Sequence, residues 1–179
     1  WKATAGGGGA NPVAGDLTSG LHTFIVKDGH TVTVDQDINV AALTVGQGAS
    51  GVLTVGNSAT GRAIVIAGNL VLNTGATMGL GATNATHTLT VSGNITNATG
   101  ALNLNPAAGR VCNTIMNGAS FPQISGGAGV ITFNDLTING GSGGADISKT
   151  ITVNGNFLID NSTPVSTAYG HTFKGNFTV

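Results

Sequence analysis

The chain has 179 residues, of which only 7% are charged, and it contains no glutamate. Ordinary soluble domains carry about 25% charged residues. Glycine, threonine, asparagine and serine make up nearly half of the sequence, and these residues favour strands, turns and corners, which excludes a helical bundle. Because 40% of the residues are hydrophobic, the composition also excludes a disordered chain, so an all-β fold is expected.

The formal net charge of -1 leaves no basic surface that could displace counterions from phosphates, so we expect no nucleic-acid partner. The longest apolar stretches, such as residues 63–67, are far shorter than the roughly 18 residues of a membrane-spanning helix, and we expect no membrane insertion. The chain begins at Trp1 and lacks a basic-then-apolar leader. This indicates a mature product, or a fragment, from which an export signal has been removed.

Residues 1–23 are predicted to form a Gly-rich N-terminal arm or linker. Four consecutive glycines, Gly6 to Gly9, are followed by Ala10-Asn11-Pro12, a composition typical of linkers. The first strands are predicted at residues 24–26 and 31–34, so a single β-solenoid domain is expected over residues 24–179.

Along this domain, short strands carry apolar residues at alternate positions, with no helical spacing. In several places two such strands form a longer unit with apolar residues at i, i+2, i+6 and i+8. The clearest copies are Val32-Val34-Ile38-Val40, Ile64-Ile66-Leu70-Leu72 and Ile151-Val153-Phe157-Ile159, with partial copies at Leu89-Val91-Ile95 and Phe173-Phe177-Val179.

The gap inside four of these units carries Gly-Asn, two residues that tolerate the left-handed backbone of sharp corners. A two-residue hairpin would place the two apolar pairs on opposite faces, but a three-residue loop would not, so hairpins remain an alternative to corners. If the four asparagines stack on successive coils, their amides would form a hydrogen-bonded ladder. The predicted corner residues are Gly68, Asn69, Gly93, Asn94, Gly155, Asn156, Gly175 and Asn176.

Blocks that begin at Ile131, Ile151 and His171 align at a spacing of 20 residues. Such a period, made of several short strands, predicts a parallel β-solenoid with coils of about 20 residues. The spacing is irregular upstream, which predicts insertions in some coils. A β-sandwich is the alternative, because strands about every 10 residues also suit that fold.

The last unit closes at Val179 with no polar cap after it, so that end of a solenoid would present an apolar section and unpaired strand edges. One interpretation is a truncated or incomplete end, and the other is that a second subunit covers it. The residues predicted to contribute to assembly are Trp1, Phe173, Phe177 and Val179.

The runs GHTVTVDQDINVAALTV, AIVIAGNLVLNTGATMGLG and HTLTVSGNITNATGALNLN resemble the repetitive parallel β-helix segments of bacterial secreted and surface proteins. These include filamentous-haemagglutinin-like proteins, autotransporter passengers and the surface repeats of Bacteroidetes-type bacteria. The resemblance covers about residues 29–179 and supplies no catalytic residues. It implies an extracellular or cell-surface location and a structural or adhesive role.

Few residues suggest chemistry. Asp28, His30, Asp35 and Asp37 form the one acidic cluster, for which a solvated corner is favoured over a weak cation site or acid-base catalysis. Cys112 is interpreted as a small buried hydrophobe, because no base can be assigned to it. The four histidines show no metal-ligand spacing and are predicted at strand edges or in loops. We therefore predict no catalytic, cofactor or metal site, and a protein that is not an enzyme.

Two glycine-rich stretches match known motifs only superficially. Gly46-x-Gly48-x-x-Gly51 fits the dinucleotide fingerprint, but a strand is predicted to follow it in place of a helix. The stretch from Gly140 to Asp146 is similar to a calcium-binding nonapeptide repeat, but it occurs once and its aspartate is one position late. A flexible corner loop is predicted there.

The composition, the repeats and the uncapped last strand favour a secreted structural protein whose copies assemble into an extracellular filament or sheath. The alternative is an adhesin or a stalk fragment of a larger bacterial surface protein, with threonine and asparagine faces that contact glycans or matrix. A polysaccharide-active enzyme that uses the Asp28 to Asp37 region is the third hypothesis.

Overall fold

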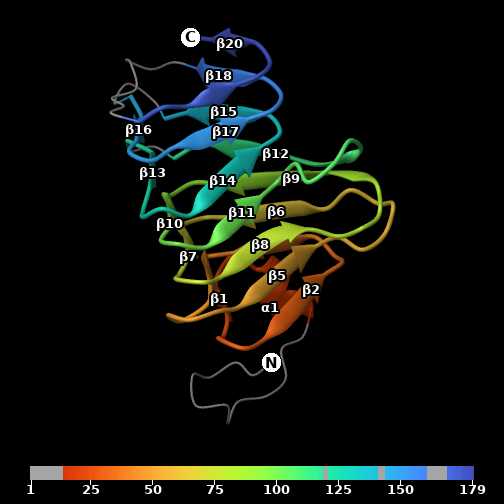
Figure 1. Cartoon of the computed structure of the whole chain (residues 1–179). Coiled ribbons are helices and arrows are strands. Elements are labelled where there is room, and N and C mark those ends of the chain that lie inside the picture. Colours follow the sequence, from red (N-terminus) through yellow and green to blue (C-terminus); the bar gives the residue numbers. More distant parts are fainter. Residues whose placement is uncertain (1–13, 119–120, 141–143, 161–168) are drawn as a thin grey trace.

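The computed structural model describes residues 14–118, 121–140, 144–160 and 169–179. Short parallel strands wind into a solenoid, as Figure 1 shows. Successive coils stack in register and form three parallel sheets. The predicted parallel β-solenoid is therefore confirmed. The β-sandwich and the hairpins at the Gly-Asn sites are excluded, because the strands on either side of each site belong to different sheets and pair in parallel with neighbouring coils.

Each sheet takes one strand from each coil. Sheet A contains β1 (Thr23–Val26), β4 (Ala42–Val45), β7 (Leu70–Leu72), β10 (Ile95–Asn97), β13 (Gln123–Ser125) and β16 (Asp146–Ile147). Sheet B contains β2 (Thr31–Val34), β5 (Val52–Val55), β8 (Thr77–Leu80), β11 (Ala101–Asn103), β14 (Val130–Phe133), β17 (Ile151–Val153) and β19 (Thr172–Phe173). Sheet C contains β3 (Ile38–Val40), β6 (Ala63–Ile66), β9 (Ala85–Val91), β12 (Arg110–Met116), β15 (Leu136–Asn139), β18 (Phe157–Asp160) and β20 (Phe177–Thr178).

Coil length varies along the rod. Partners in adjacent coils are 20 residues apart at Ile131 and Ile151, as the sequence period predicts. The separation reaches 29 residues between Ile95 and Ile124. Because the connections between strands absorb the extra residues, the ladders keep their register and the core stays continuous.

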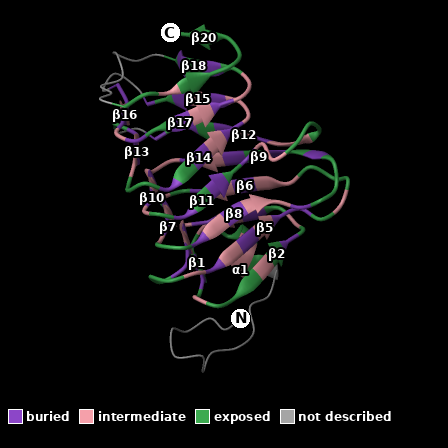
Figure 2. Cartoon of the chain, in the orientation of Figure 1, coloured by how far each residue is buried: buried purple, intermediate pink, exposed green. Residues whose placement is uncertain are grey.

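The core lies between the three sheets and runs the length of the solenoid. Strand residues alternate between buried and partly exposed positions, as Figure 2 shows. In sheet A, for example, Leu43, Leu70, Ile95 and Ile124 lie in one inward column and are at most 1% exposed. A single coil cannot bury its own interior, so this core exists only because the coils stack.

The N-terminal end of the rod is covered by the short helix α1 (Ala14–Thr18) and the segment after it. The Gly20 backbone N–H donates to the Asn39 carbonyl, and the Ala41 N–H donates to the His22 carbonyl, so residues 20–22 occupy the free edge of β3. Leu17 packs against the core. The predicted arm therefore includes residues that pack on the first coil, while Trp1 and the glycines of residues 6–9 lie outside the described residues. Within the described part of the chain, no helix is long and apolar enough to cross a membrane.

Candidate functional site

The predicted corner residues lie in two columns, not one. The condition set for an amide ladder, that all four asparagines stack on successive coils, is therefore not met. The same apolar spacing occurs at two of the three corners, so the sequence alone could not separate them. Gly68-Asn69 and Gly93-Asn94 precede β7 and β10 at the corner between sheets C and A, whereas Gly155-Asn156 and Gly175-Asn176 precede β18 and β20 at the corner between sheets B and C.

The corner asparagines bond to backbone, not to one another's amides. Oδ1 of Asn69 accepts from the Asn94 N–H at 2.8 Å, and Oδ1 of Asn94 accepts from the Gln123 N–H at 3.0 Å. At the other corner, Oδ1 of Asn156 accepts from the Asn176 N–H at 3.2 Å. The predicted amide ladder is therefore replaced by a side chain-to-backbone ladder, which gives corner N–H groups a partner outside the sheets.

At the corner between sheets B and C, aspartate side chains also accept hydrogen bonds from the backbone of the next coil. This role was not predicted from the sequence. Oδ1 of Asp135 accepts from the Asn156 N–H at 2.7 Å, and Oδ1 of Asp37 accepts from the Ala63 N–H at 2.9 Å. The signal was present, because each aspartate lies directly before a strand that resumes the apolar alternation, as the corner asparagines do. An acceptor oxygen, not an amide, is what the position requires.

The corner positions require glycine for a reason other than the predicted left-handed backbone. Their φ angles are not among the positive values found elsewhere in the chain. Close approach between coils requires glycine instead. A Cβ at Gly93 would meet Asn69 Oδ1 and the Gly68 backbone, and a Cβ at Gly155 would meet the Asp135 carboxylate.

The predicted acidic cluster is not one site. Asp28 holds the loop between β4 and β5, because its Oδ1 accepts from the Gln47 N–H at 2.6 Å and the Ser50 N–H at 3.1 Å. These backbone hydrogen bonds lower the pKa of Asp28. The Gly46 to Gly51 motif forms this loop and is followed by strand β5, as expected. Asp37 lies elsewhere, because its carboxylate accepts from the Ala63 N–H at the corner between sheets B and C. His30 is exposed, and its backbone N–H donates to the Lys27 carbonyl.

Asp35 belongs to a separate polar group with Ser58, Arg62 and His87. Its Oδ1 accepts from the Asn57 N–H at 3.1 Å, the Ser58 hydroxyl at 3.0 Å and Arg62 Nε at 3.2 Å, and these contacts lower the pKa of Asp35. Nδ1 of His87 accepts from the Arg62 backbone N–H at 3.0 Å. The serine hydroxyl thus bonds to the carboxylate and not to the imidazole, so the group lacks the serine-histidine contact that activates a nucleophile.

Buried single residues match their predicted roles only in part. Cys112 is 1% exposed, and burial raises the pKa of its thiol to about 12, which agrees with a small buried hydrophobe. His87 differs from the prediction of a strand edge or loop, because it is 2% exposed and faces inward from β9. Burial, and then the Arg62 charge, lower the pKa of His87.

The corner between sheets A and B carries a shallow groove of about 280 Å³. Glycine, alanine, threonine and valine line it across three coils, without a titratable side chain: Gly75, Ala76, Thr77, Thr99, Gly100, Ala101, Ala128, Gly129 and Val130. Within the described ranges, no group of three or more His, Cys, Asp or Glu residues could hold a metal ion.

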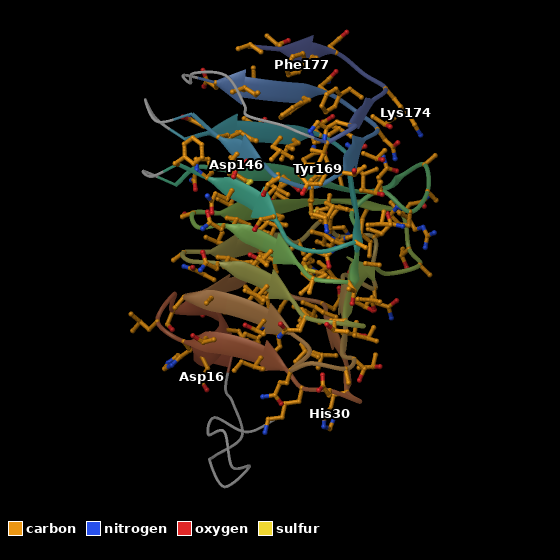
Figure 3. All side chains as sticks on the ribbon, turned by 60° about the vertical axis from the view of Figure 1, so that its left-hand side comes forward. Asp16, His30, Asp146, Tyr169, Lys174 and Phe177 are labelled. Carbon is orange, nitrogen blue, oxygen red and sulfur yellow. The ribbon has the colours of Figure 1, made fainter. Side chains whose placement is uncertain are left out.

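The C-terminal end is the part of the described structure where core positions are exposed. By the registers of sheets B and C, the inward columns of the last coils end in His171, Phe173, Phe177 and Val179. Phe173, Phe177 and Val179 are 37%, 53% and 72% exposed, whereas Val153 and Phe157, one coil below, are at most 2% exposed. Figure 2 shows β20 as exposed, and Figure 3 places Phe177 at the end of the rod opposite Asp16.

Aromatic rings gather at this end, which we call the open C-terminal coil (His171, Phe173, Phe177 and Val179). The ring of Phe157 lies 5.0 Å from that of Phe173 and 5.2 Å from that of Phe177, and the last two rings stack at 5.5 Å. The ring of His171 stacks on Phe173 at 5.9 Å. Both imidazole nitrogens of His171 are buried without a hydrogen-bond partner among the described residues, and burial lowers the pKa of His171.

Comparison of the chain with protein families, with curated proteins and with solved structures finds no match.

Proposed function

We propose that the chain is a secreted, non-enzymatic structural subunit that associates with a second copy of itself through the open C-terminal coil. The observation that carries this proposal is the exposure of Phe173, Phe177 and Val179 at positions whose register partners one coil below are buried in the core. An extracellular filament or sheath is the setting that the resemblance to bacterial surface β-helices favours.

The chemistry of this end suits another solenoid coil. The inward column Phe133, Val153 and Phe173 is continuous, so the next layer that would complete it is an apolar coil of the same kind. Burying the exposed parts of Phe173 and Phe177 would remove roughly 180 Å² of apolar surface from water, which stabilises by roughly 4 kcal/mol before the cost of association. Lys174 is the one Asp, Glu, Lys or Arg side chain among residues 169–179, so charge repulsion between the side chains of two such ends is small.

The two ends of the rod differ, and this limits the geometry of assembly. At the N-terminal end, residues 20–22 already pair with β3, so sheet C cannot receive a further strand there without displacing them. Two C-terminal ends can meet in a closed two-fold dimer, whereas a filament requires the C-terminal end of one copy to stack on sheets A and B of the next.

Sedimentation velocity over a range of protein concentrations, together with negative-stain electron microscopy, tests the proposal. We expect dimers or filaments whose population rises with concentration. Phe177→Asp should return the chain to monomers, because it places a charge in the centre of the contact. Val130→Asp is the matched control, since Val130 is 62% exposed on the outer face of sheet B, away from either end.

Circular dichroism of both variants establishes that the solenoid is intact. A monomer at every concentration, or association that Phe177→Asp and Val130→Asp weaken equally, would refute the proposal. A closed dimer and a filament both support association through the C-terminal coil, and the images distinguish them.

A second candidate, an adhesin or stalk segment of a larger surface protein, is favoured by sheet B. None of its seven strands contains a charged residue. Thr33, Thr54, Thr132, Thr152 and Thr172 fall in one outward register column. Such a face would suit neutral glycan or matrix contacts. Binding to a glycan array that Thr132→Lys abolishes, while Thr137→Lys on sheet C does not, would support this candidate, and absence of binding would reject it.

A further inference from the structure

One inward column of sheet A changes character along the rod. Its early member, Leu72, is fully buried and apolar. In the next coil Asn97 pairs in register with Leu72. When the same register is extended past the ends of β13 and β16, Asn97 aligns with Gly126, and Gly126 aligns with Lys149. A carboxamide and an amine therefore face the interior two coils apart, with a glycine between them.

Gly126, which lies between the two in this column, packs closely on the Asn97 backbone. A Cβ at this position would meet the Asn97 carbonyl oxygen, so no larger residue fits there. The Nζ of Lys149 lies 2.9 Å from the Asn97 backbone oxygen, to which it donates a hydrogen bond. Lys149 is 2% exposed and Asn97 is fully buried, so the pair is shielded from water.

Neither group has the partners that its burial requires. Within the described residues, Lys149 Nζ makes a single hydrogen bond, to the Asn97 carbonyl oxygen. No carboxylate of these residues forms an ion pair with it. Nδ2 of Asn97 donates to the carbonyls of Gly100 at 3.1 Å and Val130 at 3.0 Å, which fixes the carboxamide. Its Oδ1 is buried with no hydrogen-bond partner among the described residues.

A buried ammonium group without a counter-charge is costly, so the amine is driven toward its neutral form. Burial accordingly lowers the pKa of Lys149. A neutral amine is a nucleophile, and a fixed neighbour in a closed interior gives it a high effective concentration toward that neighbour.

We propose that Lys149 and Asn97 are the two partners of an intramolecular isopeptide bond that staples the fourth coil (β10 to β12) to the sixth (β16 to β18). The neutral Nζ adds to Cγ of Asn97, the Nζ–Cγ bond replaces the Cγ–Nδ2 bond, and one proton passes from Nζ to Nδ2. The nitrogen leaves as ammonia. No electron is transferred and no co-reactant is consumed. The product is a neutral secondary amide, which, unlike the amine, cannot become protonated and so cannot place a charge in the core.

Mass spectrometry of the full-length protein tests this bond directly. The intact mass should fall below the sequence mass by one ammonia, increasingly with time at neutral pH in folded protein. Trypsin cuts the unlinked chain into peptides that include residues 63–110, 111–149 and 150–174. Because trypsin does not cut after an acylated lysine, the linked chain should instead yield residues 63–110 joined to residues 111–174.

Two controls sharpen the result. Lys149→Arg keeps the cleavage site and a positive charge but cannot form the bond, so it should retain the sequence mass and give the separate peptides. Lys174→Arg, which changes an exposed lysine, should link as the parent chain does. An aged, folded sample with the full sequence mass and three separate peptides would overturn the proposal, and so would a link that joins Lys149 to any residue other than Asn97. The mass readout is independent of self-association.

Discussion

Replacement of Asn94 by alanine isolates one rung of the corner ladder. The substitution removes the acceptor of the Gln123 N–H and leaves the Asn94 backbone N–H free to keep donating to Asn69 Oδ1. The Gln123 contact is partly buried, so water replaces the lost acceptor only in part. We therefore expect Asn94→Ala to destabilise the solenoid at the corner between sheets C and A.

The size of the effect follows from the hydrogen bond and its exposure. A protein hydrogen bond contributes about 0.5–1.5 kcal/mol net, and a partly buried, unsatisfied N–H places this loss at about 1 kcal/mol. Asn69→Ala breaks the exposed rung below it and should lose less, about 0.5 kcal/mol. Asn94→Asp should retain most of the stability, because Asp37 and Asp135 fill the equivalent position at the other corner.

Urea unfolding followed by circular dichroism measures the free energy of unfolding of each variant. Amide hydrogen exchange adds a local readout, because the stability of a solenoid is largely a sum of neighbouring interactions. The Gln123 amide should exchange faster in Asn94→Ala and at the normal rate in Asn94→Asp. A loss below about 0.3 kcal/mol in Asn94→Ala, with unchanged exchange at Gln123, would refute the ladder as a source of stability.

Three further predictions concern the core and the corners. Gly93→Ala should lower the free energy of unfolding, measured in urea, by about 1–3 kcal/mol, because its Cβ would overlap the coil below. A smaller loss would show that the backbone at this corner can shift to make room. Leu102→Ala, at a fully buried core position, should lose about 2–5 kcal/mol by calorimetry, whereas a negligible change would contradict the packing described above. Because the folded-state pKa of His87 is lowered, the unfolded chain binds more protons below about pH 6.5, so stability should fall as the pH drops. His87→Asn, which keeps an acceptor for the Arg62 N–H, should flatten this dependence in unfolding measured between pH 5 and pH 8, and an unaltered profile would assign it to other groups.

Composition and the period-two alternation determined the fold class. A chain with short apolar strands, Gly-Asn corners and a 20-residue period has few ways to bury its apolar residues other than stacking parallel coils. The blocks at Ile131 and Ile151 pair in the structure as their spacing predicts. The burial of Cys112 also followed from its chemistry alone.

Tertiary structure decided which corner each motif occupies and which residues meet across coils. A solenoid with three sheets offers more than one corner of similar local chemistry, and insertions of varying length change which strands stack, so a local pattern cannot identify its partners. Asp135 bonds to Asn156 and Lys149 reaches Asn97 because the register of the coils aligns them, although 21 and 52 residues separate these pairs in the sequence. The sequence by itself thus determined that the chain would wind into stacked coils, whereas only the stacked structure determined the contacts, because these depend on the summed lengths of the intervening coils.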